Sequence, residues 1–237
     1  MNSGFDTLLY HKQDGVAWVV LNRPQVLNAY NIRMRDELYQ VLEAIRDDPD
    51  VGVVVFRGEG RAFCAGADLS EFLTAPPSTA ARRARWERDV WGLFLGLPQP
   101  LIAALHGYVL GSGIEIALCC DLRLAARGTR FGLPEVGLGI IPAAGGTQTL
   151  PRAMVPRGKA LEMLLTGDLI DADEAHRLGL LGRVVPPEAL LAEAEAMARR
   201  LLSLPPGLAT RIKRAVHRGL DMGLREGLEL EGELGWL

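Results

Sequence analysis

The chain has 237 residues, 49% of them hydrophobic, and a formal net charge of −3 at pH 7. This length suffices for one large α/β domain with a substantial core, and the slightly acidic balance gives no electrostatic reason to expect nucleic acid as a partner. The sequence contains neither a membrane-spanning apolar run nor a basic and apolar leader. We therefore expect a soluble protein with no membrane partner, made without a secretory signal.

The first half of the chain is typical of an α/β protein. Residues 7–10 and 16–21 flank Asp14-Gly15 and predict a β-hairpin. Residues 31–47 place apolar side chains on one helical face, and residues 51–56 form a continuous apolar run of the kind found in strands buried on both sides. Strand, helix and strand at these lengths predict right-handed crossover units.

A polar segment rich in Ala and Pro, residues 74–81, comes next and is followed by a predicted helix with four arginines, Arg82, Arg83, Arg85 and Arg88. The basic run has two interpretations. It is either a phosphate-binding element or a solvated helix face offset by Glu87 and Asp89, and the second is the more common case.

Two glycine-rich turns in the middle of the chain each deliver one glutamate. Residues 101–105 predict a buried strand, and residues 107–115 lead from it into a helix over 112–120 that carries Glu115. Residues 121–126 predict another strand, and Phe131-Gly132-Leu133-Pro134-Glu135 follows. A helix start leaves backbone N–H groups unpaired, so an anion-stabilising site beside a carboxylate is expected here.

The chain after Pro151 predicts mainly helices, over 156–166, 171–178, 187–203, 206–220 and 224 to the end. The change of composition near Val185-Pro186-Pro187 predicts a boundary between a core at 1–185 and a helical region at 186–237.

The cysteines and histidines indicate no metal centre. Cys64, Cys119 and Cys120 provide no disulfide framework, and the adjacent pair on an apolar helix is better interpreted as core than as ligands. A reducing, cytoplasmic location fits these free thiols. The four histidines, His11, His106, His176 and His217, are scattered, and His106 is interpreted as structural.

Five segments together give the sequence a specific resemblance. They are Leu21-Asn22-Arg23-Pro24, residues 63–69 with the order Phe-Cys-Ala-Gly-Ala-Asp-Leu, residues 107–115, residues 131–135, and residues 142–148 with the order Pro-Ala-Ala-Gly-Gly-Thr-Gln. In these segments the chain resembles the crotonase superfamily, and within it the enoyl-CoA hydratase/isomerase family. The resemblance implies an α/β fold that is a spiral of ββα units over 1–185. It also implies a shortened C-terminal helical region over 186–237 that joins subunits into a homotrimer or a pair of trimers.

The resemblance also implies a reaction, the addition of water across the 2,3 double bond of a 2-enoyl-CoA. The backbone N–H groups of Ala67 and Ser112 would bind the thioester oxygen, and Glu115 and Glu135 would hold the attacking water. Coenzyme A would be part of the substrate, with no tightly bound cofactor. The acyl-CoA would lie along Val26, Ala29, Ala65, Gly66, Asp68, Leu69, Gly111, Pro134 and Pro142.

Several of these residues have plainer interpretations. Glu115 could lie on a helix surface, although its apolar neighbours argue against exposure, and Glu135 could be an ordinary loop carboxylate. Asp68 could cap the segment 69–73 instead of contacting substrate, and capping is the preferred interpretation.

The chain departs from the family pattern at several positions. Ser112 stands where the family usually has glycine. A serine would strain the backbone there if that position required a positive φ. Gln25 and Glu71 stand where relatives often have lysine, which leaves Arg23 as a candidate partner for the 3′-phosphate. The early end at Trp236-Leu237 bears on affinity for coenzyme A. Alternative functions are therefore an isomerase or another acyl-CoA enzyme of the superfamily, a non-catalytic acyl-CoA-binding subunit, or an enzyme inactive without a longer tail.

Overall fold

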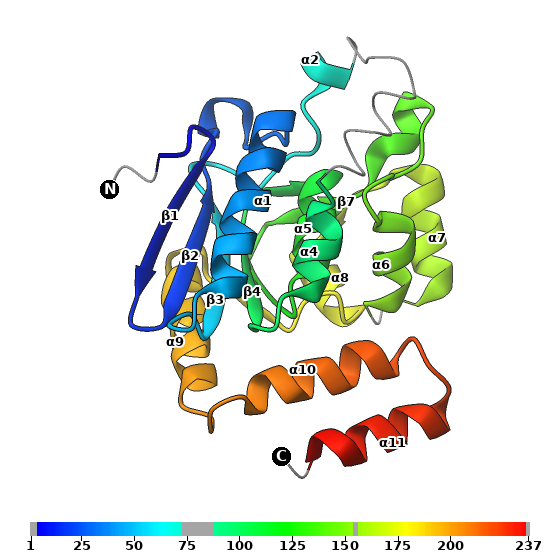
Figure 1. Cartoon of the computed structure of the whole chain (residues 1–237). Coiled ribbons are helices and arrows are strands. Elements are labelled where there is room, and N and C mark those ends of the chain that lie inside the picture. Colours follow the sequence, from blue (N-terminus) through cyan, green and yellow to red (C-terminus); the bar gives the residue numbers. More distant parts are fainter. Residues whose placement is uncertain (1–3, 73–87, 154–155, 236–237) are drawn as a thin grey trace.

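The computed structural model describes residues 4–72, 88–153 and 156–235 (Figure 1). The polar segment 74–81 and the predicted helix with Arg82, Arg83 and Arg85 lie outside the described residues, as does the C-terminal Trp236-Leu237.

A six-stranded sheet forms the centre of the molecule. Its order is β1–β2–β3–β4–β6–β9, with the strands at Leu8–Gln13, Val16–Leu21, Val53–Gly58, Leu101–Leu105, Leu122–Ala126 and Arg183–Val185. The predicted hairpin is confirmed, because β1 and β2 are antiparallel around Asp14 and Gly15, both of which have positive φ. All the other neighbours in this sheet are parallel, as crossover connections require.

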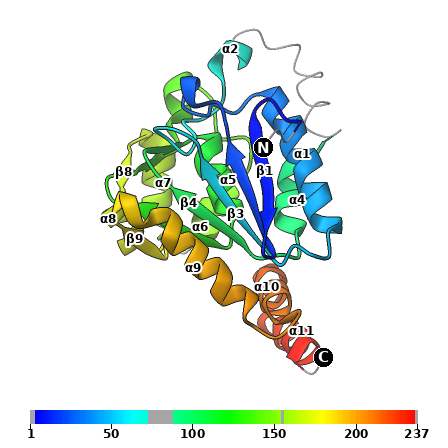
Figure 2. The same cartoon turned by 90° about the vertical axis from the view of Figure 1, so that its left-hand side faces the viewer.

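Helices cover both faces of this sheet. On one face lie α1 (Ile32–Asp47), α4 (Val90–Gly96) and α5 (Ser112–Cys119), packed against alternate strand residues such as Val54 and Phe56. On the other face α9 (Leu190–Leu202) packs against the intervening residues, such as Val53 and Val55 (Figure 2). Burial on both faces explains why β3 and β4 are continuous apolar runs in the sequence.

A small second sheet contains the strands that directly precede the segments with Glu115 and Glu135. It contains β5 (Tyr108–Leu110), β7 (Arg130–Gly132) and β8 (Ile170–Asp171). These strands of two or three residues are too short to give a periodic pattern, and the sequence predicted none of the three. The remaining elements are α2 (Leu69–Phe72), α6 (Gly146–Arg152), α7 (Arg157–Thr166), α8 (Ala172–Arg177) and the 3₁₀ turns η1 (Pro24–Val26), η2 (Pro134–Leu138) and η3 (Pro187–Ala189).

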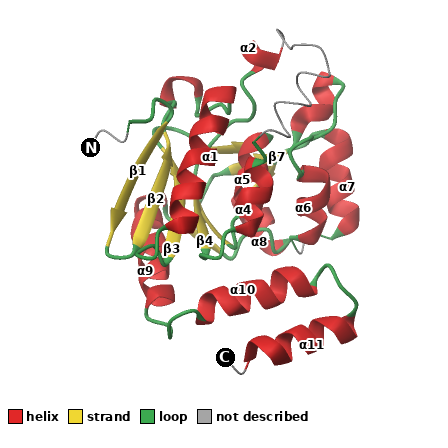
Figure 3. Ribbon diagram, in the orientation of Figure 1, coloured by secondary structure: helices red, strands yellow, loops and turns green. Residues whose placement is uncertain are grey.

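The last two helices lie below the core as a separate pair (Figure 3). Helices α10 (Leu208–Gly219) and α11 (Leu224–Gly235) contact each other, and Lys213 and His217 of α10 bind Asp121 of the core. The helix α9, although it follows the boundary predicted at 185/186, packs on the sheet. The division into two regions at that position stays a prediction.

The cysteines are core residues, as expected. Cys64, Cys119 and Cys120 are all buried. His106 is also structural, because its Nε2 lies 3.0 Å from the carbonyl oxygen of Gly60.

Candidate active site

Two loops from distant parts of the chain meet at one edge of the core. The loop after β3 pairs with β5, since Leu110 N–H donates to the Cys64 carbonyl at 3.0 Å. Gly66 and Gly111 then pass so closely that a Cβ atom on Gly111 would lie 3.4 Å from the Gly66 Cα. This approach brings the segment with Ala67 beside the start of α5.

The backbone N–H groups of Ala67 and Ser112 have no hydrogen-bond partner within the described part of the chain. Ser112 is the first residue of α5, where the helix has no acceptor for its N–H and the helix dipole favours negative charge. The structure therefore presents two unpaired donors on adjacent segments, as an oxyanion hole requires.

The serine at position 112 causes no backbone strain. The positive φ in this turn belongs to Gly111, with φ 49° and ψ −123°, and Ser112 has no positive φ. The backbone therefore requires glycine at position 111, and not at position 112, where this chain has serine in place of the family's usual glycine.

Glu115 lies one turn into α5 and is buried, with 3% of its surface exposed. Its Oε1 accepts hydrogen bonds from the backbone N–H groups of Ala144 at 3.0 Å and Gly146 at 2.8 Å. A Cβ on Gly146 would lie 3.2 Å from this oxygen, so glycine leaves room for the carboxylate. Donors of this kind favour the ionised carboxylate. The interpretation of Glu115 as a surface residue is wrong.

Glu135 lies in the first turn of η2 with Pro134 before it. Its Oε2 is buried and has no hydrogen-bond partner among the described residues, and a Cβ on Gly111 would lie 2.8 Å from its Oε1. Burial raises the pKa of Glu135. The effect of burial outweighs a hydrogen bond from its own backbone N–H, which lowers the pKa, so this site favours the protonated form of the carboxyl group.

Two of the segments predicted to bind the acyl-CoA, residues 26–29 and 65–69, are joined by a backbone hydrogen bond. Ala65 N–H donates to the Leu27 carbonyl at 3.0 Å, which joins the loop of Val26 and Ala29 to the loop of residues 65–69. Val26 and Leu69 are exposed, at 41% and 49%. Pro142 is buried beside Gly146, whereas Pro134 is exposed beside Gly167.

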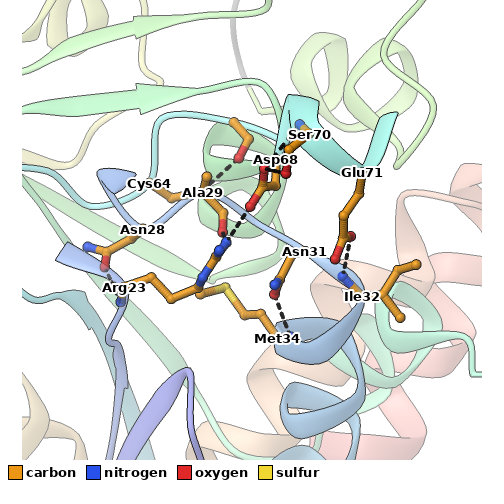
Figure 4. A network of polar contacts seen from close by, with 11 residues as sticks. Arg23, Asn28, Ala29, Asn31, Ile32, Met34, Cys64, Asp68, Ser70 and Glu71 are labelled. Carbon is orange, nitrogen blue, oxygen red and sulfur yellow. Dashed lines mark hydrogen bonds and ion pairs between the residues drawn. The ribbon is translucent and has the colours of Figure 1, made fainter. Parts of the chain in front are cut away.

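Asp68 is bound within the protein on both of its oxygens (Figure 4). Its Oδ1 accepts from the N–H and the hydroxyl of Ser70, at 3.2 and 2.7 Å, which is the geometry of the preferred capping interpretation. Its Oδ2 lies 2.8 Å from Nη1 of Arg23. The hydrogen bonds from Ser70 and from Arg23 lower the pKa of Asp68.

The sequence interpretation missed two donors and one organising side chain. The N–H groups of Ala144 and Gly146 fall in the segment 142–148, from which only Pro142 was assigned to the site. Asn28 is fully buried, accepts from Arg23 N–H at 2.7 Å, and donates to the carbonyls of Glu59 and Ala62. The available signal was the Asn-Ala pair after Pro24, but a single asparagine in a loop does not reveal its partners.

Other reactive groups do not form a second centre among the described residues. Burial raises the pKa of the Cys64 thiol to about 12, so this neighbour of the site is no thiolate nucleophile. Burial lowers the pKa of His106. Within residues 4–72, 88–153 and 156–235 no group of three or more His, Cys, Asp or Glu could hold a metal ion, and no helix is long and apolar enough to cross a membrane.

Residues 11–235 match the family model described as enoyl-CoA hydratase/isomerase. The chain belongs to this family. The fold agrees, because a solved enoyl-CoA hydratase subunit from Geobacillus kaustophilus superposes with a TM-score of 0.92 at 39% identity, over 99% of this chain and 90% of that one. The prediction of a crotonase-like α/β fold is confirmed.

Curated relatives are similar over nearly the whole chain. A probable enoyl-CoA hydratase of Mycobacterium tuberculosis is 39% identical over 230 residues, which are 97% of this chain and 88% of the relative. A crotonyl-CoA hydratase of Syntrophomonas wolfei is 38% identical over 231 residues, with the same coverage of each chain.

Proposed function

We propose that this member of the family is an enoyl-CoA hydratase, which adds water to a 2-enoyl-CoA to give the 3-hydroxyacyl-CoA. The observation that carries the proposal is the combination of two N–H donors, at Ala67 and Ser112, that lack a partner among the described residues, with a buried Glu115 and a half-buried Glu135 in different environments. The hydratase names of the relatives support the same reaction.

The two donors would bind the thioester oxygen of the substrate. Attack of water on the β-carbon moves negative charge onto that oxygen, and the N–H groups of Ala67 and Ser112 stabilise it there. Each preorganised donor of this type contributes about 3 kcal/mol to the transition state. The charge also lies at the N-terminus of α5, where the helix dipole favours it.

The different environments of the glutamates support different roles for them. Glu115, held by two N–H donors, suits the base that takes a proton from the attacking water. Glu135, with a raised pKa and one oxygen that lacks a partner in the described part of the chain, suits the acid that gives a proton to the α-carbon. The proton count balances, because Glu115 gains one proton from the water and Glu135 loses one proton to the α-carbon. Two carboxyl groups in one site titrate as a coupled pair, so a pH profile reports values of the pair.

The two alternative functions, double-bond isomerisation and non-catalytic acyl-CoA binding, do not require both glutamates. Double-bond isomerisation moves one proton between two carbons and needs no second carboxyl group to hold a water. A non-catalytic acyl-CoA-binding subunit needs no buried carboxyl group at all, and burying one costs stability. The presence of both Glu115 and Glu135 therefore favours hydration.

Loss of the enoyl-thioester absorbance of crotonyl-CoA tests the proposal. We expect turnover by the wild type and a loss of at least about 10³-fold in kcat for Glu115→Gln and for Glu135→Gln. If the wild type binds crotonyl-CoA and longer enoyl-CoAs without hydrating them, the proposal is wrong. Turnover of a 3-enoyl-CoA in that case would favour the isomerase.

The assembly and location are proposals of the same kind. Exposed apolar side chains on α10, at its C-cap and on α11 support assembly into a trimer or a pair of trimers; they are Ile212, Val216, Leu220, Leu224 and Leu228. Light scattering on the purified protein tests this. The three buried free thiols support the cytoplasm as location.

A further inference from the structure

One nitrogen of Arg23 connects the two segments that surround Ala67. Nη1 of Arg23 donates to the carbonyl oxygen of Ala29 at 2.6 Å and to Oδ2 of Asp68 at 2.8 Å. Ala29 precedes Tyr30, and Asp68 follows Ala67. The Arg23 side chain is only 17% exposed and that of Asp68 only 15%, so water weakens this ion pair little (Figure 4).

Two backbone hydrogen bonds with Tyr30 fix the direction of the Ala67 N–H. Tyr30 N–H donates to the Gly66 carbonyl, and Asp68 N–H donates to the Tyr30 carbonyl, both at 2.8 Å. The Gly66 carbonyl and the Ala67 N–H belong to one trans peptide unit, in which they point in opposite directions. The bond from Tyr30 therefore turns the Ala67 N–H away from Tyr30, which leaves it available as a donor.

Arg23 adds a side-chain contact that joins the same two segments. The Ala29 carbonyl and the Asp68 carboxylate are both acceptors and repel each other, and they share Nη1 of Arg23. Asn28 supports the same loop from the other side, by accepting from Arg23 N–H. Leu27 and Asn28 have positive φ, an unfavourable backbone that persists only where surrounding bonds hold it.

We propose that Arg23 is a positioning residue that acts through Asp68 and Ala29 to hold the Ala67 N–H in its oxyanion-binding direction. This role differs from the phosphate contact that the sequence suggested for Arg23. Both hydrogen bonds that its guanidinium makes within the described part of the chain come from Nη1. The inference rests on the proposed oxyanion hole, but it does not depend on which reaction follows thioester binding.

The test uses Arg23→Gln, Arg23→Lys and Asp68→Asn in the full-length protein. The first readout is the infrared carbonyl stretch of bound butanoyl-CoA labelled with ¹³C at the thioester carbonyl. We expect a shift to lower frequency in the wild type and loss of most of that shift in Arg23→Gln and Asp68→Asn. The second readout is crotonyl-CoA hydration, where we expect kcat to fall about 10- to 100-fold with KM nearly unchanged, because a displaced donor acts mainly on the transition state.

Arg57→Gln is the matched control. Nη1 of Arg57 likewise joins a carbonyl, that of Gly58 at 3.3 Å, and a carboxylate, that of Glu59 at 2.8 Å, and its side chain is 23% exposed. We expect this variant to keep both the carbonyl shift and kcat. Arg23→Lys keeps the charge, and we expect it to restore part of the shift that Arg23→Gln loses.

The outcomes separate the inference from the proposed function. A wild type that polarises the labelled carbonyl but hydrates no enoyl-CoA contradicts the hydratase proposal, and the loss of the shift in Arg23→Gln still supports the positioning role. If the variants keep the full carbonyl shift, or if only KM rises, the positioning role is wrong and a contact with the coenzyme A phosphate is favoured. If Arg23→Gln does not fold, Asp68→Asn decides by the same two readouts.

Discussion

Gly111 lies against Glu135, so that a Cβ atom on Gly111 would stand 2.8 Å from Oε1 of Glu135. The same glycine has φ 49° and ψ −123°, passes close to Gly66, and precedes the Ser112 N–H. One residue without a side chain thus allows the turn, the meeting of the two loops and the placement of the second glutamate. Substitutions here should affect all three.

We expect Gly111→Ala to lower kcat for crotonyl-CoA about 100-fold or more. The new methyl group would displace the Glu135 carboxyl group, and the strained backbone would move the Ser112 N–H. Strain of this kind also costs about 1–3 kcal/mol of stability. Steady-state kinetics and urea unfolding measure the two effects.

Gly128→Ala is the control for Gly111→Ala. Gly128 also has a positive φ, of 85°, but a Cβ there meets nothing within 4 Å. It should lose stability with little change in kcat. Equal kinetic losses in the two variants would show that backbone strain alone, and not the contact with Glu135, explains the effect.

Ser112→Gly should leave kcat within about threefold of the wild type. The donor is the backbone N–H, which glycine also has, and position 112 has no positive φ that would favour glycine. Replacing a helical serine by glycine costs at most about 1 kcal/mol. A tenfold change of kcat in either direction would show that the buried serine side chain takes part in the reaction.

The sequence predicted those parts of the fold and site that have a local pattern. The hairpin follows from the turn residues Asp14-Gly15, the helix α1 from its apolar face, and the strands buried on both faces of the sheet from continuous apolar runs. Glu115 and Glu135 were recognisable because each stands in a glycine- or proline-containing motif. The burial of Glu115 and of the Oε2 atom of Glu135 is consistent with the predicted roles, which stay predictions.

The parts that were missed depend on contacts between distant segments. The short strands β5 and β8 exist through their pairing with β7. The helix α6 contains Pro151 and begins after Gly145, so its sequence favours a loop. The difference between Glu115 and Glu135 arises from the N–H groups of Ala144 and Gly146, 29 and 31 residues from Glu115, and no local pattern reveals it.

The raised pKa of Glu135 predicts a pH-dependent stability difference. The folded chain keeps a proton on Glu135 to a higher pH than the unfolded chain does, so it binds more protons between the two pKa values. The free energy of unfolding contributed by this group falls as the pH rises through that window. Glu135→Gln removes the titration, so the variant should gain stability relative to the wild type as the pH rises from about 4, the ordinary pKa of a glutamate, through the raised pKa of the folded chain.

Urea unfolding of both proteins across this range measures the difference. Glu188→Gln, at an exposed carboxyl group in η3, is the control and should show no such trend. A constant difference between the wild type and Glu135→Gln would show that the folded chain does not raise the pKa of Glu135.

Asp121 connects the core to α10, the first of the two C-terminal helices. Its carboxylate lies 2.9 Å from Nζ of Lys213 and 2.9 Å from Nε2 of His217, and it accepts from Leu101 N–H at 2.7 Å. Burial opposes the ionisation of Asp121, but the bonds from His217 and Lys213 outweigh it and lower its pKa. The stabilisation is therefore present above the pKa of the unfolded chain and is lost as the pH falls through the lowered pKa.

We expect Asp121→Asn to lower the free energy of unfolding by about 3 kcal/mol at neutral pH, because the Lys213 side chain, only 8% exposed, loses its counter-charge. The amide oxygen can still accept from Leu101 N–H, so the variant removes the charge and keeps the shape. Asp47→Asn, at an exposed carboxylate paired with Arg46, is the control and should change stability far less, because water screens an exposed ion pair. The difference in free energy of unfolding between the wild type and Asp121→Asn depends on ionised Asp121, so it should shrink in strong acid. A difference that persists in strong acid would show that packing, and not charge, causes the effect.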